Sequence, residues 1–319
     1  MCVRFLFEFG DAYNGFLLAY GWTQAHGFFV IMGGFYLFDG KTLQHPLTRN
    51  QVKDLVQKGL LIPPSEDEIK DKSKGDALSK AIVLVQVAWF VVQCIARRIQ
   101  HLPITELEIM TLAYTAVNAA IYGFWWYKPL SVRCPVRVVA GSQLSEAKVD
   151  LISKGPWLDA ISYVFKLVDG TQDSMTNVSD EKQVPIFYAA KPDKAQRDLA
   201  AAISVIVAMI FGGIHCFAWS LQFPSHAEQL LWRVSSIAIL GYPGILGLTF
   251  LFESLWVKYY KHPITDITSR RYLIVLFVLG IPVYVAGRVI LVVLAFATLR
   301  SLPQGAYGTP QWTIFIPHI

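Results

Sequence analysis

The segment at residues 272–299 constrains the fold of this chain more than any other. It is 28 residues long and contains a single charged side chain, Arg288, close to its middle. An apolar run of about 18 residues or more is typical of a membrane-spanning helix, because backbone groups in lipid must bond to one another. An arginine at that depth is costly, so the other helices have to supply polar partners or a wet cavity.

The composition supports a membrane protein with several spans. Apolar residues make up 54% of the 319 residues and charged residues only 16%, against about 25% in an ordinary soluble domain. The net charge of +5 comes from basic residues that cluster in particular loops. It does not point to a nucleic-acid partner, because no basic stretch interleaves with aromatic residues and no helix-turn-helix or zinc-finger spacing is present.

Apolar segments predict an all-α fold, a polytopic transmembrane bundle that forms a single membrane domain over residues 1–319. About six spans are expected, at residues 16–38, 77–96, 109–127, 199–221, 230–257 and 272–299. Polar loops at 39–76 and 128–197 interrupt them, and we expect short amphipathic helices in the cytosolic loops. The capping boxes Ser65–Glu68 and Thr105–Glu108 predict helix starts, because the hydroxyl takes a free helix N–H and the Glu reaches back.

Basic residues predict the orientation of these spans. The links at residues 39–76, 128–197 and 258–271 carry 7, 10 and 4 Lys and Arg residues, and the opposite side holds few. Loops rich in Lys and Arg stay cytoplasmic, so we expect these three links to be cytosolic. The protein is then a multi-pass membrane protein whose first partner is the lipid bilayer.

A layer of polar side chains is predicted at the depth of Arg288. Depth is compared between helices at a rise of about 1.5 Å per residue. The residues at or within about a turn of that depth are Gln93, Glu108, Thr111, His215 and, in the first span, residues 22–26.

Two hypotheses explain this layer. In the first, Gln93, Thr111 and Glu108 satisfy Arg288 and hold the helices in register. In the second, the layer lines a pocket for a small polar or anionic ligand. The candidate ligand-binding residues are Arg288, His215, Gln93, Glu108 and His26.

The fifth span contains a predicted hinge. Its centre reads Gly241-Tyr242-Pro243-Gly244. Proline removes a helix hydrogen bond and neighbouring glycines favour a kink or break. Pro243 and Gly244 are therefore the expected mobile element, and broken helices near the membrane midplane are where transporters place substrates.

Signatures of common enzymes and cofactor sites are missing from the sequence. There is no Walker motif, G-x-S-x-G, H-E-x-x-H, Gly-rich dinucleotide loop or Asp-rich prenyl-diphosphate motif. A metal or haem site on His26 and His215 is disfavoured, because neither has a ligand partner three or four residues on. We expect no metal and no cofactor.

Several stretches together carry a resemblance to a known family. They are Thr23–Phe35, Glu68–Ser79, Trp89–Arg97, Leu102–Ile109, Trp125–Val132 and Leu299–Ile319. From about Gly21 to the C-terminus the chain resembles a large family of fungal multi-span integral membrane proteins with no assigned activity. The resemblance implies a fungal membrane setting. Members usually carry further hydrophobic segments before the region matching Trp22, so we expect a shortened member or a truncated gene model.

Three function classes follow. The leading one is a non-enzymatic carrier, channel-like protein or receptor for a small polar or anionic ligand, centred on Arg288 and His215. The alternative is a membrane-embedded enzyme acting on a lipid-soluble substrate, with Glu108, His215 or Glu253 as acid or base. The third is a scaffold whose cytosolic loops bind a partner.

Overall fold

The structure, a computed structural model, forms two compact units. It describes residues 21–40, 42–71, 76–129, 132, 134–139, 184, 194–260 and 267–312. Unit 1 comprises residues 1–80 and 122–201, and unit 2 comprises residues 81–121 and 202–319. We describe each unit by itself.

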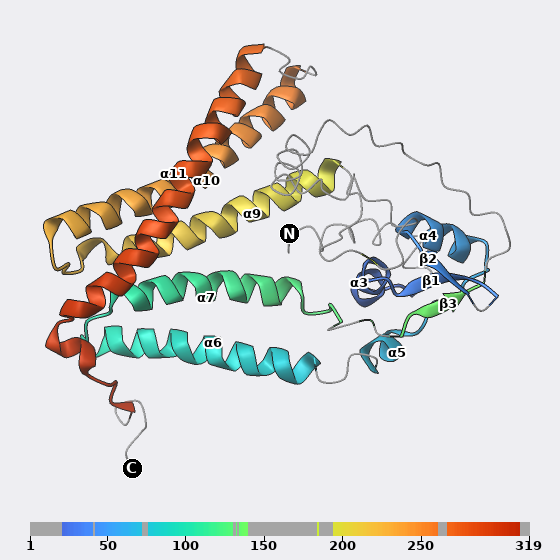
Figure 1. The fold of residues 1–319 in the computed structure, drawn as a ribbon, viewed down its shortest axis with the longest axis horizontal. Helices are drawn as coiled ribbons and strands as arrows, with labels where there is room; N and C mark the ends of the chain where they lie inside the picture. Colours follow the sequence, from blue (N-terminus) through green and yellow to red (C-terminus); the bar gives the residue numbers. More distant parts are fainter. Residues whose placement is uncertain are drawn as a thin grey trace. The chain divides into compact units, whose positions relative to one another are not determined.

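In its described residues, unit 1 holds a small sheet and three short helices (Figure 1). The elements are α3 (Gln24–Ile31), β1 (Phe35–Asp39), β2 (Thr42–Pro46), α4 (Arg49–Gln57), α5 (Glu66–Asp71) and β3 (Val136–Val138). The strand order is β2-β1-β3, with β1 antiparallel to β2 and parallel to β3. The sheet was not expected from an all-α prediction.

The predicted first span at residues 16–38 is wrong over its described part. Helix α3 covers only eight residues, and β1 begins at Phe35. The helix ends because Gly33 adopts a φ of 79°, a left-handed conformation that suits glycine. The aromatic run that follows, Phe35-Tyr36-Leu37-Phe38, favours a strand.

The apolar residues of this stretch form the core of unit 1. Phe29 and Phe35 pack edge to face, with ring centroids 5.4 Å apart, and are almost completely buried. Their core also includes Leu47, Val52 and Leu55 from the segment predicted as a polar loop. These side chains are therefore covered by protein.

Unit 2 is built from long helices. They are α6 (Asp76–Ile99), α7 (Glu106–Phe124), α9 (Lys194–His215), α10 (His226–Tyr260) and α11 (Ile267–Ala297), with short 3₁₀ turns at Cys216–Ser220, Thr298–Ser301 and Gln304–Tyr307. Among the described residues, four helical segments are long and apolar enough to span a membrane: Leu78–Ile99, Asp198–Ser220, His226–Tyr260 and Val275–Ser301. They overlap the second, fourth, fifth and sixth predicted spans. Helix α7 overlaps the third predicted span.

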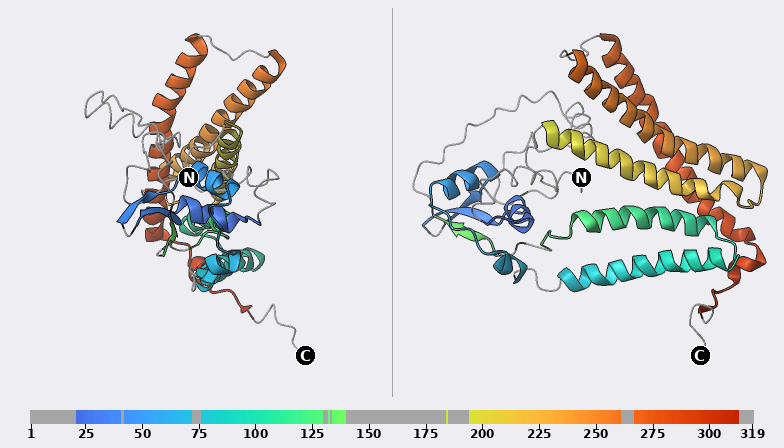
Figure 2. Two further views of the ribbon diagram at one scale, coloured as in Figure 1. Left: turned by 90° about the vertical axis from the view of Figure 1, so that its right-hand side faces the viewer. Right: turned by 180° about the vertical axis from the view of Figure 1, so that it is seen from behind.

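Glycines let the helices of unit 2 approach closely, as small residues do in membrane bundles. A Cβ on Gly212 of α9 would lie 2.7 Å from the Cα of Leu240 on α10. A Cβ on Gly280 of α11 would overlap the Tyr242 ring on α10, and one on Gly287 would lie 3.3 Å from Ile239. The middle of α10 is therefore packed between α9 and α11, and Figure 2 shows α10 and α11 crossing.

Candidate functional site

Arg288 on α11 lies among aromatic side chains from three helices of unit 2. Its guanidinium donates to the hydroxyl of Tyr284 at 3.2 Å and to that of Tyr114 at 3.4 Å. The guanidinium carbon lies 4.2 Å from the Phe211 ring centroid and 5.7 Å from each tyrosine centroid. Tyr284 precedes Arg288 by one helical turn, whereas Tyr114 comes from α7 and Phe211 from α9.

These partners of Arg288 are all uncharged. Among the described residues, its hydrogen bonds go to two phenol hydroxyls and its other contacts to ring faces. Ring faces attract a cation, but they do not neutralise it. Arg288 is half-buried, so its charge is partly shielded from solvent and uncompensated by these contacts.

The predicted partners of Arg288 lie elsewhere. Glu108 forms an ion pair with Arg97, with Oε1 3.4 Å from Nε. The Thr111 hydroxyl donates to the carbonyl of Leu107, one turn earlier in the same helix, at 2.8 Å. The prediction that Glu108 and Thr111 satisfy Arg288 is therefore wrong. Gln93 is half-buried on α6.

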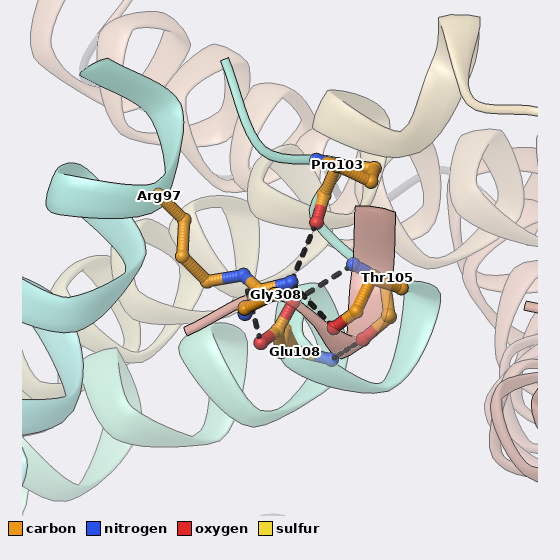
Figure 3. A network of polar contacts seen from close by, with 6 residues as sticks. Arg97, Pro103, Thr105, Glu108 and Gly308 are labelled. Carbon is orange, nitrogen blue, oxygen red and sulfur yellow. Dashed lines mark hydrogen bonds and ion pairs between the residues drawn. The ribbon is translucent and has the colours of Figure 1, made fainter. Parts of the chain in front are cut away.

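Arg97 is the centre of a polar network at one end of unit 2 (Figure 3). It is 6% exposed. Its guanidinium donates to the carbonyls of Pro103, Ala306 and Gly308, each at 2.9 Å. The Glu108 carboxylate that pairs with it also accepts from the Thr105 backbone N–H at 2.9 Å. The predicted capping box thus forms and holds Arg97 at the same time.

The network fixes the C-terminal segment against the end of α6. The Gln100 side chain accepts from the backbone N–H of Gln311 at 2.9 Å and donates to its carbonyl at 3.1 Å. The rings of Trp89 and Trp312 stack at 4.8 Å. Sequence reasoning gave Arg97 no role, although Pro103 and the glycine-rich stretch before Gln311 signal irregular backbone with carbonyls to satisfy.

His215, at the end of α9, contacts the same aromatic ring as Arg288. Its imidazole lies 4.7 Å from the Phe211 ring centroid, the same ring that the guanidinium covers. Nδ1 lies 2.8 Å from the Phe211 carbonyl, and a carbonyl only accepts, so Nδ1 carries the proton. The Trp232 indole donates to the His215 carbonyl at 3.1 Å. His215 is fully buried.

His26 lies in unit 1, so the structure does not join it to the Arg288 cluster. Its Nδ1 accepts from the Thr23 backbone N–H at 3.1 Å, and its Nε2 donates to the Pro64 carbonyl at 2.8 Å. Burial lowers the pKa of His26 from its usual 6.5. The side chain caps α3 and ties it to the segment before α5.

The predicted hinge lies inside a continuous helix. Pro243 is buried in α10, which runs unbroken from His226 to Tyr260. Figure 1 shows that α10 changes direction midway. Proline cannot donate to the carbonyl one turn earlier, which accounts for a bend, whereas a break at Pro243 and Gly244 is not observed.

Comparison with known proteins places the chain in a family. A family of unknown function (DUF8562) matches residues 11–169 and 193–319. The chain belongs to this family. No curated protein and no solved structure matches it.

In this DUF8562 member, Arg288 and its neighbours form a cluster of hydrogen-bond donors. The cluster presents one guanidinium and two phenol hydroxyls, which are donors suited to a carboxylate or phosphate. In the described ranges, no group of three or more His, Cys, Asp or Glu residues is placed to hold a metal ion. Among the described residues, His215 contacts a backbone carbonyl, an indole and aromatic rings.

Proposed function

We propose that this DUF8562 protein is a multi-pass membrane protein that binds a small anionic ligand at Arg288, as a carrier or receptor. The four candidate spans support a membrane location. Large apolar side chains on these helices are exposed, for example Leu248 at 67% and Leu279 at 63%. Contiguous apolar surface of this kind is costly in water and suits lipid.

The observation that carries the proposal is the neutral surroundings of Arg288. An arginine within an apolar span requires compensation, and its described partners are phenols and ring faces. Arg97 in the same unit has a carboxylate. A ligand anion would neutralise the charge of Arg288, as the Glu108 carboxylate neutralises that of Arg97. The hydroxyls of Tyr114 and Tyr284 would orient this anion.

We further propose α7 as a fifth span beside the four candidates, in place of a helix at residues 16–38. The basic links then support a cytosolic position for residues 39–76, 128–197 and 258–271. The fungal setting implied by the resemblance belongs to the same proposal. For a carrier, the bend of α10 at Pro243 is the element that would move.

The test is ligand-dependent stabilisation of the purified full-length protein in a non-ionic detergent. Thermal midpoints are measured with phosphate, acetate, butyrate and oleate, and with the neutral analogues butyramide and methyl oleate. A ligand that binds only the folded state raises the midpoint. We expect at least one anion to stabilise the parent while its neutral analogue does not.

The variants assign that effect to the site. Arg288→Met is expected to abolish the anion-dependent shift, and Arg288→Lys to retain part of it because the charge remains. The matched control is Arg233→Met, because Arg233 also covers a ring and binds a neutral carbonyl, that of Trp219. Equal anion shifts in the parent and Arg288→Met, or no shift with any anion, would reject the proposed function.

A further inference from the structure

An exposed apolar row runs along α11 beside Arg288. At about 100° per residue, four residues fall on one side of Arg288, about 60° to 100° around the helix. Their exposed fractions are 57% for Val278, 52% for Val285, 56% for Val289 and 60% for Phe296. Gly287 and Leu291, about 60° to 100° around the other side of Arg288, are buried, with Gly287 against Ile239 and Leu291 only 1% exposed. Arg288 therefore lies at the border between packed and exposed surface.

The face of α7 that carries Tyr114 is polar and exposed. Tyr114 is 40% exposed, and Thr111 and Asn118, one turn to either side, are exposed as well. The Tyr114 hydroxyl accepts a hydrogen bond from the Arg288 guanidinium. A ligand at Arg288 would thus meet the Tyr114 hydroxyl on α7 and an apolar row on α11.

We propose that the anion bound at Arg288 is the head group of a long-chain amphiphile, such as a fatty acid carboxylate, whose acyl chain lies along the Val278–Phe296 row. The inference rests on the proposed anion site and names its ligand class. A site flanked by exposed valines in an apolar span is reached from the hydrocarbon layer. An acyl chain concentrates an anion in that layer, whereas a short water-soluble anion stays outside it.

The test measures binding of radiolabelled oleate to immobilised full-length protein in non-ionic detergent. The competitors are unlabelled oleate, methyl oleate, which lacks the charge, and butyrate, which lacks the long chain. We expect unlabelled oleate to compete and methyl oleate not to compete. Butyrate should require a concentration at least about 100-fold higher than that of oleate. Arg288→Met is expected to lose the specific binding.

A matched pair of variants tests the apolar row. Val289→Ser removes apolar surface about 100° from Arg288, whereas Val283→Ser removes it about 140° away on the opposite flank. The two valines are equally exposed, at 56% and 57%. We expect Val289→Ser to weaken oleate binding about threefold or more and Val283→Ser to leave it unchanged. Neither change should alter butyrate binding.

The outcomes separate the two proposals. If butyrate competes as well as oleate and both require Arg288, the anion site stands and the amphiphile inference fails. If methyl oleate competes as well as oleate, the inference fails without any variant having to fold. If Val289→Ser and Val283→Ser weaken oleate equally, the acyl chain does not follow this row. If oleate does not bind the parent, the amphiphile inference fails, and the anion site is then decided by the thermal shifts with phosphate, acetate and butyrate.

Discussion

Unit 1 buries the apolar side chains of helix α3 in protein, whereas the long helices of unit 2 leave many large apolar side chains exposed. Phe28 and Phe29 of unit 1 are 0% and 1% exposed, and Phe296 of unit 2 is 60% exposed. Both regions are rich in apolar residues. Apolar content alone therefore does not reveal whether protein or lipid surrounds a segment.

The distinction lies in how the apolar residues are interrupted. The stretch at residues 16–38 contains four glycines, Gln24 and His26, and its described part folds as a short helix, a turn and a strand. The stretch at residues 272–299 has Arg288 as its only charge; it lies in helix α11 as far as Ala297 and then in a 3₁₀ turn. Uninterrupted length is the feature that separates them.

The largest predicted effect comes from truncating a phenylalanine in each unit. Phe29→Ala should cost unit 1 about 3–5 kcal/mol, because it removes a buried ring and leaves a cavity. Phe296→Ala should change the stability of unit 2 by less than about 0.5 kcal/mol, because its ring is exposed. Hydrogen exchange of peptides covering α3 and the end of α11 measures both. Similar costs at the two positions would remove the contrast between the units.

The sequence was sufficient for the long elements of the fold. Four predicted spans overlap the four candidate spans, because uninterrupted apolar length needs no knowledge of partners. The capping boxes at Ser65 and Thr105 form as predicted. Unit 1 was missed because its core joins α3 to α4 and β3. Two local signals had been available: the Thr48–Gln51 capping box and the glycine pair after Met32.

A second comparison concerns the stability cost of removing each of two arginines of unit 2, one with a charged partner and one without. Arg97→Met should destabilise unit 2 by about 1–3 kcal/mol, because the half-buried Glu108 carboxylate and three carbonyls lose their donor. Arg288→Met should cost less than about 1 kcal/mol or stabilise the protein, because an uncompensated charge disappears. Chemical unfolding in detergent, followed by the fluorescence of buried Trp232, measures both.

A double variant checks the reason for the Arg97 effect. Glu108→Gln keeps an acceptor for the capping box at Thr105 and removes the charge. Adding it to Arg97→Met should recover part of the lost stability. If the double variant is no more stable than Arg97→Met, the unpaired carboxylate is not the source of the cost.

The candidate site was only partly predictable. Arg288 was found because a charge inside an apolar run is conspicuous, and its proximity to His215 follows from depth. Its real partners were not predicted, because they are tyrosine and phenylalanine rings, which do not stand out in an apolar segment as charged and amide groups do. Tyr284, one turn before Arg288, was the local signal. Predicting the contacts of Tyr114 and Phe211 would require the rotation of α7 and α9 about their own axes, which no single segment of sequence specifies.

Adjacent glycines on α9 test the packing that positions Phe211 beneath Arg288. Gly212→Ala should cost about 1–3 kcal/mol, because its Cβ would lie 2.7 Å from the Leu240 backbone. Gly213→Ala meets no atom within 4 Å and should be neutral or stabilising by up to about 1 kcal/mol. Thermal unfolding distinguishes them. If Gly213→Ala is the more damaging, α9 packs in a different rotation.

The smallest effect is a pH dependence confined to unit 1. Burial lowers the pKa of His26 below 6.5, so the unfolded chain takes up a proton at a higher pH than the folded chain does. The stability that His26 contributes is therefore present above about pH 6.5 and is lost as the pH falls toward the lowered pKa. Protonation also removes the Nδ1 acceptor for the Thr23 N–H. Hydrogen exchange of the α3 amides should accelerate between pH 7.5 and pH 5, after correction for intrinsic exchange rates.

The control variant is His26→Gln, which keeps a capping acceptor, as Gln51 does for Thr48. It should flatten this pH dependence, while α9 and α11 exchange as in the parent. Equal pH dependence in the parent and in His26→Gln would show that another group titrates.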